Sequence, residues 1–157
     1  MTNSLPPLDQ SLSMALLRAR EGTLLPVREM LANSGITEQQ WRVLRILDQN
    51  GPTDSSSLAA AANLHFPSLT RITQTMISKG YITRTQDPND RRRHMIAIAE
   101  AGAQLINNHR EKENEITQEY RNILGEENYL QLIELLAILD PKSKTDANSE
   151  KMYWTKT

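Results

Sequence analysis

The sequence predicts a mainly α fold of the α+β class with a winged helix–turn–helix at its centre. Apolar residues recur at the period of a helix through most of the chain. Between residues 53 and 79, a short helical segment, a tight turn and a longer helical segment follow one another. Two segments of alternating polarity then flank a turn, which is the pattern of a β-hairpin. A helix, a turn, a helix and a hairpin in this order are typical of a winged helix–turn–helix.

Length and composition are those of one ordinary domain. The chain has 157 residues, and its hydrophobic fraction of 38% still allows a buried core. Because it has no cysteine, disulfides, thiolate metal sites and cysteine-based redox sensing are excluded. The first residues lack the features of a signal peptide, and an apolar run such as Leu135–Leu139 is too short to span a bilayer. We therefore expect a cytoplasmic protein that does not associate with a membrane.

Two helices are expected before the helix–turn–helix. Residues 9–33 carry an apolar seam at helical spacing, and Pro26 is expected to kink or divide this first helix. Thr37 opens a second helix, in which Gln40 at the third position completes a capping box. The sequence Asn50-Gly51-Pro52 ends the second helix.

The helix–turn–helix is predicted from its turn residues and its apolar spacing. Its first helix begins near Thr53 or Asp54 and continues through alanines to Ala62. The turn at residues 63–66 follows, and Pro67 suits the first position of the second helix. The apolar face of that second helix is formed by residues at i, i+3 and i+7, which are Leu69, Ile72 and Met76.

A hairpin and two more helices complete the expected order. The expected segments are strands at 81–86 and 93–98 and helices at 100–120 and 126–140. Asp87-Pro88-Asn89-Asp90 forms the hairpin turn, and Gly125 separates the two helices. Residues 141–157, which begin with a proline, are expected to form a polar tail.

The formal net charge of −1 hides an uneven distribution of charge. Residues 64–98 hold six basic and two acidic side chains, a net charge of +4. Residues 100–140 hold three basic and nine acidic side chains, a net charge of −6. A phosphate backbone responds to the local field and to local counterion release, so the basic middle of the chain favours a nucleic-acid partner. An ordinary solvated surface with chance clustering is the alternative.

The exposed face of the second helix of the helix–turn–helix is suited to reading DNA. Arg71 can bind guanine through two hydrogen bonds, and Gln74 can bind adenine in the same way. Ser68 and Thr70 can hold phosphates or base edges. No carboxylate interrupts residues 64–86. These four side chains are expected to bind double-stranded DNA, the alternative being a solvated helix face of chance polarity.

The hairpin turn gathers three consecutive arginines, Arg91–Arg93. Arginines at such a tip suit insertion into a narrow, electronegative minor groove. Asp90 would weaken binding to phosphate unless it pairs with a neighbouring arginine and holds the shape of the loop. We therefore assign Asp90, Arg91 and Arg92 to the DNA interface, the alternative being a solvated charged turn.

Three motifs carry a resemblance to a known family. They are Ser68-Leu69-Thr70-Arg71, Gly80-Tyr81-Ile82-Thr83-Arg84 and Asp87-Pro88-Asn89-Asp90-Arg91-Arg92. The last is similar to the D-P-x-D-R-R wing signature of the MarR family of bacterial transcriptional regulators. Residues 16–21 and 37–42 resemble the branch of that family that controls aromatic-acid catabolism, which includes homoprotocatechuate and hydroxycinnamate regulators.

The resemblance implies a homodimer that places one winged helix on each half-site of a pseudo-palindromic operator. It implies dimerisation through helices at 9–35 and 100–140, and DNA binding through residues 36–99. Carried over by position, it assigns Ser68, Thr70, Arg71 and Gln74 to the base-reading helix, and Arg92 to the minor groove. The function it implies is that of a ligand-responsive regulator, most commonly a repressor, of an aromatic-compound catabolic operon.

The resemblance also implies an effector pocket between the dimerisation helices and the winged domain. Ser11, Met14, Arg18 and Glu21 recur on one face of the first helix, where a guanidinium beside apolar groups suits an aromatic carboxylate. The expected ligand-binding residues are Ser11, Arg18, Glu21, Trp41, Arg45 and His65. Two alternatives stay open: an ion pair between Arg18 and Glu21 within the helix, and Trp41 as a core residue.

Other classes of function are disfavoured. The chain has no phosphate-binding glycine loop, no HExxH motif and no cysteine nucleophile, so we expect neither an enzyme nor a bound cofactor. A metal site of Asp87, Asp90 and His94 is disfavoured because the neighbouring arginines satisfy the carboxylates. A winged-helix protein that binds DNA constitutively, without a small-molecule effector, is the remaining alternative.

Overall fold

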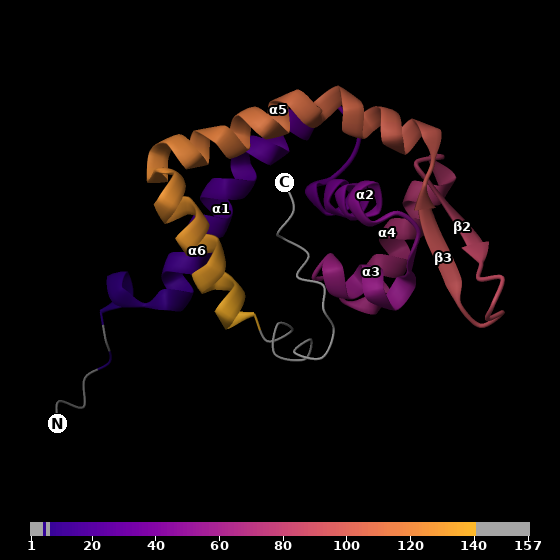
Figure 1. The fold of residues 1–157 in the computed structure, drawn as a ribbon, viewed down its shortest axis with the longest axis horizontal. Coiled ribbons are helices and arrows are strands. Elements are labelled where there is room, and N and C mark those ends of the chain that lie inside the picture. Colours follow the sequence, from indigo (N-terminus) through magenta and orange to yellow (C-terminus); the bar gives the residue numbers. More distant parts are fainter. Residues whose placement is uncertain (1–4, 6, 141–157) are drawn as a thin grey trace. The chain divides into compact units, whose positions relative to one another are not determined.

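The computed structural model describes residues 5 and 7–140 of the chain. It divides into two compact units, one up to residue 114 and one from residue 115, each considered by itself. The elements are η1 (Leu8–Gln10), α1 (Leu12–Leu31), α2 (Glu38–Asn50), β1 (Thr53–Asp54), α3 (Ser55–Ala61), α4 (Phe66–Ser78), β2 (Ile82–Gln86), β3 (His94–Ile98), α5 (Glu100–Leu124) and α6 (Glu126–Leu139) (Figure 1). The predicted fold class is confirmed, and the predicted polar tail, 141–157, lies outside the described residues.

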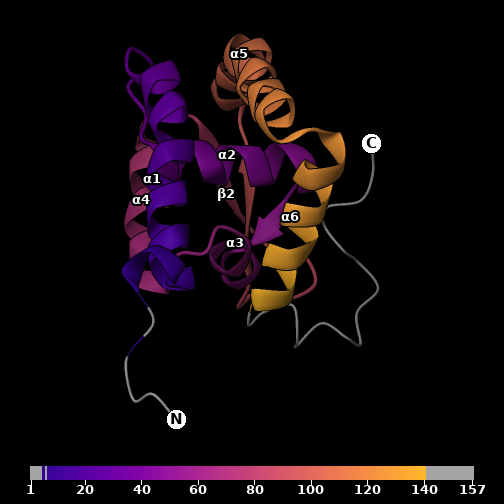
Figure 2. The ribbon, with the colours of Figure 1, turned by 90° about the vertical axis from the view of Figure 1, so that its left-hand side faces the viewer.

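Helix α1 is one continuous helix (Figure 2), and Pro26 lies inside it. Of the two effects expected of this proline, a kink or a division, the division is not observed. A proline ring crowds the carbonyl group four residues earlier, here that of Gly22, and the helix accommodates this without a break. Past the end of the helix, the Ser34 hydroxyl donates to the Leu31 carbonyl at 2.7 Å and satisfies one of its last acceptors.

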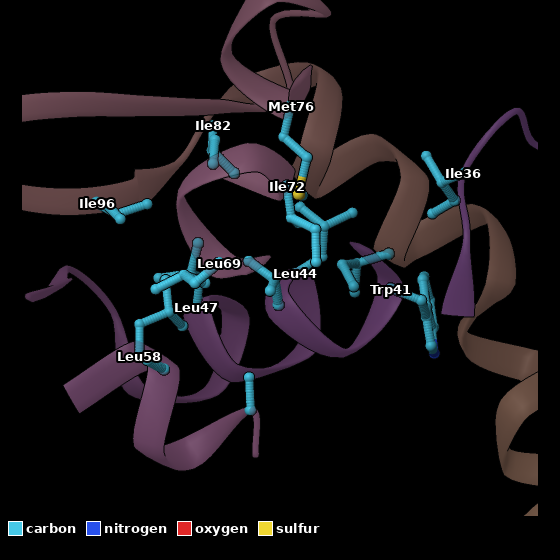
Figure 3. Close-up of a cluster of buried hydrophobic side chains, with 14 of the residues drawn as sticks. Ile36, Trp41, Leu44, Leu47, Leu58, Leu69, Ile72, Met76, Ile82 and Ile96 are labelled. Carbon is cyan, nitrogen blue, oxygen red and sulfur yellow. The ribbon is translucent and has the colours of Figure 1, made fainter. Parts of the chain in front are cut away.

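Helix α2 supplies the centre of the buried core. The Thr37 hydroxyl accepts a hydrogen bond from the Gln40 backbone N–H at 3.2 Å, and the Gln40 side chain accepts one from the Thr37 N–H at 3.0 Å. The predicted capping box is therefore confirmed. Figure 3 shows Leu44 and Leu47 of this helix among apolar side chains from α3, α4 and the sheet, and both are at most 1% exposed.

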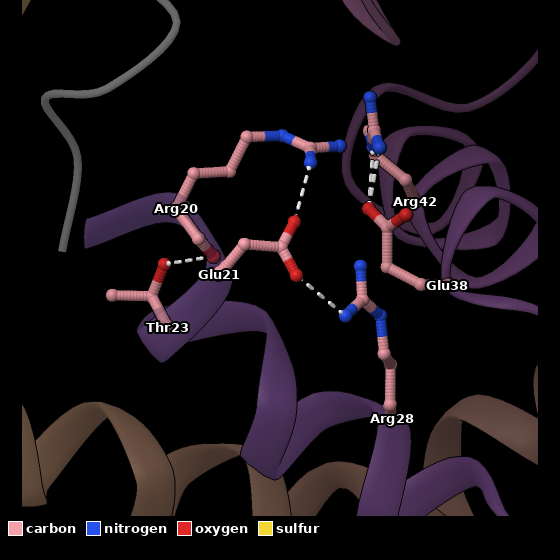
Figure 4. Close-up of polar contacts among 6 residues, drawn as sticks. All are labelled: Arg20, Glu21, Thr23, Arg28, Glu38 and Arg42. Carbon is pink, nitrogen blue, oxygen red and sulfur yellow. Dashed lines mark hydrogen bonds and ion pairs between the residues drawn. The ribbon is translucent and has the colours of Figure 1, made fainter. Parts of the chain in front are cut away.

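The first helix of the helix–turn–helix is α3, and side-chain hydrogen bonds cap both of its ends. The Asp54 carboxylate caps its start, accepting from the Ser57 backbone N–H at 3.0 Å and from the Ser57 hydroxyl at 2.7 Å. At its other end, the Arg42 guanidinium of α2 donates to the Ala62 carbonyl at 2.7 Å. Arg42 also pairs with Glu38, and this pair holds its guanidinium in place (Figure 4).

The turn between α3 and α4 is shorter than the sequence indicated. Asn63 adopts a positive φ of 50°, a conformation that asparagine tolerates better than most residues. Phe66 is the first residue of α4 rather than part of the turn, so Pro67 stands at the second helical position. The predicted apolar face is confirmed, because Leu69, Ile72 and Met76 are all buried.

The wing belongs to a three-stranded antiparallel sheet with the order β1-β3-β2. The predicted hairpin is confirmed, with Ile82 opposite Ile98 and Gln86 opposite His94. Strand β1 is a two-residue strand that the sequence did not indicate. It pairs Thr53 with Ile96, which attaches the wing to the start of the helix–turn–helix.

The unit from residue 115 contains the end of α5 and the whole of α6. Helix α5 extends past its expected end to Leu124, where Gly125 with a φ of 79° separates it from α6. The Arg121 guanidinium pairs with Glu126 and lies 4.6 Å from the centroid of the Tyr129 ring, which fixes this corner. No residue of α6 is buried within this one chain. Its exposed apolar side chains are Leu130, Leu132, Ile133, Leu135, Ile138 and Leu139.

Two further structural facts bear on function. None of the helices among the described residues has both the length and the apolar character that a bilayer crossing requires. Within the same residues, no three histidine or acidic side chains gather closely enough to bind a metal ion.

Candidate DNA interface and effector site

Helix α4 presents the four predicted base-reading side chains on its outer surface. Arg71 and Gln74 are exposed, and Ser68 and Thr70 are partly exposed. In the part of the chain that the structure describes, the Arg71 guanidinium and the Gln74 amide make no hydrogen bond or ion pair. Their donors are therefore available to a base edge.

The threonine hydroxyl groups of α4 are already engaged within the helix. Thr70 Oγ1 donates to the Phe66 carbonyl at 3.0 Å, and Thr75 Oγ1 donates to the Arg71 carbonyl at 3.1 Å. Their oxygens still have lone pairs that can accept a hydrogen bond. Among the predicted base-reading side chains, Arg71 and Gln74 therefore keep donors that are unengaged within the described residues, while Thr70 is suited to an acceptor role or to contact through its methyl group.

The wing tip is held by its own acidic residues. The Asp90 carboxylate accepts from the Arg92 backbone N–H at 2.9 Å, and the Asp87 carboxylate accepts from the Asn89 backbone N–H at 2.9 Å. Asp90 thus holds the shape of the loop through the backbone of Arg92 rather than by pairing with its guanidinium. Arg91 and Arg92 are exposed, so their side chains are available to phosphates.

Arg93 has a different role from its two neighbours. Its guanidinium pairs with the Asp54 carboxylate at 2.9 Å, which ties the wing to the cap of α3. The hydrogen bond from the Ser57 backbone N–H lowers the pKa of Asp54, and the Ser57 hydroxyl and Arg93 lower it further. The carboxylate therefore stays ionised and keeps both the helix cap and the arginine. Sequence reasoning could not find this contact because 39 residues separate the partners.

On α1, the expected effector residues do not converge. Ser11 is bonded to Ser13 at 3.0 Å between their hydroxyl oxygens, and Arg18 is exposed. Glu21 pairs with Arg20 at 3.1 Å and with Arg28 at 3.0 Å, not with Arg18 (Figure 4). The hydrogen bond and charge of Arg28 lower the pKa of Glu21. The intrahelical Arg18–Glu21 ion pair, one of the alternatives, is therefore not observed.

Trp41 and Arg45 on α2 each contact a residue of α5. The Trp41 ring meets the His109 ring edge-on with 5.6 Å between centroids, and the Arg45 guanidinium pairs with Glu113 at 2.9 Å. Both pairs repeat at a spacing of four residues, so the contacts form two successive rungs between the helices, which we call the α2–α5 ladder. His109 and Glu113 were missed as candidates, although their spacing matches that of Trp41 and Arg45.

The first rung of the ladder has an unmet hydrogen-bond donor. Trp41 is only 4% exposed, which agrees with the core alternative, yet its indole Nε1 has no partner among the described residues. A buried donor without an acceptor costs about 1–3 kcal/mol. His65, the other expected ligand residue, is exposed at the start of α4 and makes no side-chain cap there.

A shallow groove of about 390 Å³ lies between the end of α1 and the start of α2. Arg28, Ile36, Thr37 and Glu38 contribute to its lining. None of the six expected ligand-binding residues lines this groove, so it does not coincide with the predicted effector site.

A helix–turn–helix with a carboxylate-free outer surface, next to a wing tipped with arginines, defines the winged-helix class of DNA-binding protein. Comparison with known proteins gives the family. Residues 36–94 match the MarR family. The chain is 35% identical over 129 residues to the HTH-type transcriptional regulator FarR of Neisseria gonorrhoeae, a match covering 82% of this chain and 88% of that protein. The chain belongs to the MarR family.

Two further relatives refine the picture. The homoprotocatechuate degradative operon repressor of Escherichia coli is 36% identical over 113 residues, covering 72% of this chain and 74% of that protein. The crystal structure of NadR in complex with 4-hydroxyphenylacetate has a TM-score of 0.77 at 34% identity, covering 88% of this chain and 96% of that chain. The resemblance read from the wing motif is therefore confirmed, and the family and these relatives are transcriptional regulators rather than enzymes.

Proposed function

We propose that this protein is a cytoplasmic repressor that binds a pseudo-palindromic operator as a homodimer and leaves it when an aromatic or phenolic carboxylate binds. The observation that carries the proposal is the combination of the α4 face, with Arg71 and Gln74 exposed, and the wing with Arg91 and Arg92. The repressor named for homoprotocatechuate degradation and the NadR complex with 4-hydroxyphenylacetate support the effector class. The target is then an aromatic-compound catabolic operon.

The exposed apolar side chains support dimerisation through the terminal helices, proposed as residues 9–35 and 100–140. On α1, Leu12, Leu17 and Leu25 are each more than half exposed. The apolar surface of α6 is likewise uncovered in the single chain. Apolar area of this kind is stabilised when a second copy covers it, which leaves residues 36–99 to bind DNA.

A binding assay tests the function directly. Duplexes that bind the protein are selected from a randomised library, and the selected duplex is then labelled for fluorescence anisotropy. We expect the protein to prefer this duplex over a scrambled one, and to lose affinity when 4-hydroxyphenylacetate is added. Binding that stays unchanged across a panel of aromatic acids would favour the constitutive DNA-binding alternative.

Replacing Arg92 with alanine is expected to weaken binding to the selected and the scrambled duplex by similar factors. The reason is that a wing arginine contacts phosphates and the minor groove, which carry little sequence information. The magnitude of the slope of log affinity against log salt concentration should fall by about one for each operator half-site. Arg20→Ala, which changes an arginine of α1, is the control and should leave the slope unchanged.

The contacts of the α2–α5 ladder predict that two substitutions change the affinity for the effector in opposite directions. If the effector carboxylate binds Arg45, then Glu113 competes for the same guanidinium. Arg45→Gln is expected to weaken 4-hydroxyphenylacetate binding about tenfold or more, because a charged hydrogen bond contributes about 1.5–3 kcal/mol. Glu113→Gln keeps Arg45 but removes the competing charge, so it should tighten binding.

Isothermal titration calorimetry of the two variants and the wild type measures both effects. Asp48→Asn is the matched control, because Asp48 lies 3.8 Å from Arg45 and contacts it more weakly than Glu113 does. Weaker binding in both Arg45→Gln and Glu113→Gln would mean that the ladder is only structural, and would remove Arg45 from the effector site.

A further inference from the structure

Phe66 has an apolar side chain that is exposed beside the polar side chains of α4. It is the only phenylalanine of the chain and is 53% exposed at the first position of α4. The residues that follow it on the outer surface are the serine, threonine, arginine and glutamine already assigned to DNA. A single exposed apolar side chain is ordinary on a protein surface, but this ring lies beside the groups assigned to DNA, where it can contact the same partner.

The register of α4 places Phe66 at the edge of the base-reading face. Phe66, Thr70 and Gln74 follow one another at a spacing of four residues and therefore lie along one stripe of the helix. The hydrogen bond from Thr70 Oγ1 to the Phe66 carbonyl, 3.0 Å long, joins the first two members. The buried side of the helix is formed by Leu69, Ile72, Thr73 and Met76, and Phe66 lies at its border with the exposed face.

Phe66 also stands at the end of the helix that usually reaches base edges. In helix–turn–helix proteins, the residues at the start of the second helix contact bases in the major groove. Arg71 and Gln74 can form hydrogen bonds with the polar groups of that groove, and the apolar group of the groove is the 5-methyl of thymine. No carboxylate lies between residues 55 and 86, so nothing in this segment repels the phosphates on either side.

We propose that Phe66 packs against the 5-methyl group of a thymine at one fixed position in each operator half-site. Phe66 is thus a specificity-determining residue, adding a thymine preference that the polar side chains of α4 do not supply. This inference rests on the proposed binding of DNA by α4. It assigns to Phe66 the reading of a methyl group rather than contact with a sugar or a phosphate.

Functional-group replacement in the DNA tests the proposal. In the duplex selected by the wild-type protein, each thymine is replaced in turn by deoxyuridine, which lacks only the methyl group. At one symmetric pair of positions, the replacement should weaken wild-type binding by about fourfold per half-site, the effect of leaving one methyl unburied. The Phe66→Ala variant should bind the thymine duplex more weakly and show no loss at that position.

Two controls make the result specific to Phe66. Ile77→Ala removes the other large exposed hydrophobic side chain of α4, which is 37% exposed at the far end of the helix, and should keep the full thymine dependence. Phe66→Leu, which keeps an apolar side chain, should keep part of it. Circular dichroism checks that each variant is folded.

The possible failures differ from one another. In one failure, replacing the thymine with deoxyuridine weakens binding by the Phe66→Ala variant as much as binding by the wild type. In another, no thymine replacement weakens binding by the wild type. Either result would mean that Phe66 does not read a methyl group, while DNA binding by α4 still stands. If the wild-type protein selects no duplex at all, the proposed function itself is overturned together with this inference.

Discussion

Replacing Gly102 with alanine is expected to lower the free energy of unfolding by about 3 kcal/mol, a typical cost of overpacking a well-filled core. Gly102 is a buried residue in the first turns of α5. A Cβ atom there would lie 2.2 Å from the Tyr81 carbonyl oxygen, 3.0 Å from Ile98 and 3.1 Å from Leu44. The first of these distances is much shorter than van der Waals contact. The clashing atom is the backbone oxygen of Tyr81, which cannot rotate out of the way as a side chain could.

The Tyr81 carbonyl is not free to move without further loss. It accepts the Ala99 backbone N–H at 3.0 Å, the hydrogen bond that joins the start of the wing to the residue before α5. Alanine is favoured over glycine in a helix by about 1 kcal/mol, and this gain is too small to offset the displacement. The clash therefore decides the sign of the effect.

Urea denaturation followed by circular dichroism measures this effect, and the chain contains a matched control. Gly22 also lies inside a helix, but a Cβ atom added there would meet nothing within 4 Å. Gly22→Ala should leave the stability unchanged or raise it by up to about 1 kcal/mol. Equal stabilities for the two variants would show that α5 does not pack against the wing as closely as described.

Much of the winged helix–turn–helix could be predicted from the sequence because its signals are local. The capping box of Thr37 and Gln40 lies within four residues, and the buried face of α4 follows from its spacing alone. Strand β1 could not be predicted in this way. It has two residues, and its pairing with β3 depends on a partner more than 40 positions away.

The candidate sites show the same division. The exposure of Arg71 and Gln74 follows from the burial of the opposite helix face, so periodicity was sufficient to place them. Trp41 shows the limit of such reasoning, because spacing could not tell whether it is a core residue or part of a ligand site. The structure shows a buried ring whose N–H has no acceptor among residues 5 and 7–140. The contact of Arg45 with Glu113 spans 68 residues and leaves no local signal.

Replacing Arg71 with alanine is expected to remove most of the sequence preference at one base pair of each half-site. A bidentate arginine–guanine contact discriminates against a wrong base by about 1–3 kcal/mol, and a symmetric dimer makes that contact twice. Binding to the selected duplex should therefore fall by about a hundredfold when each contact contributes about 1.4 kcal/mol. Binding to the scrambled duplex should fall much less, because only one positive charge per subunit is lost.

Arg71→Lys separates the charge of the side chain from its geometry. Lysine keeps the positive charge but cannot present the two parallel N–H donors of a guanidinium. The Arg71→Lys variant should bind the scrambled duplex with the wild-type affinity. It should recover only a small part of the preference for the selected duplex. Anisotropy titrations of both duplexes at several salt concentrations give the two quantities separately. If lysine restored the full preference, or if alanine weakened both duplexes equally, Arg71 would be a phosphate contact like Arg92, and base reading would have to lie with Gln74 and its neighbours on α4.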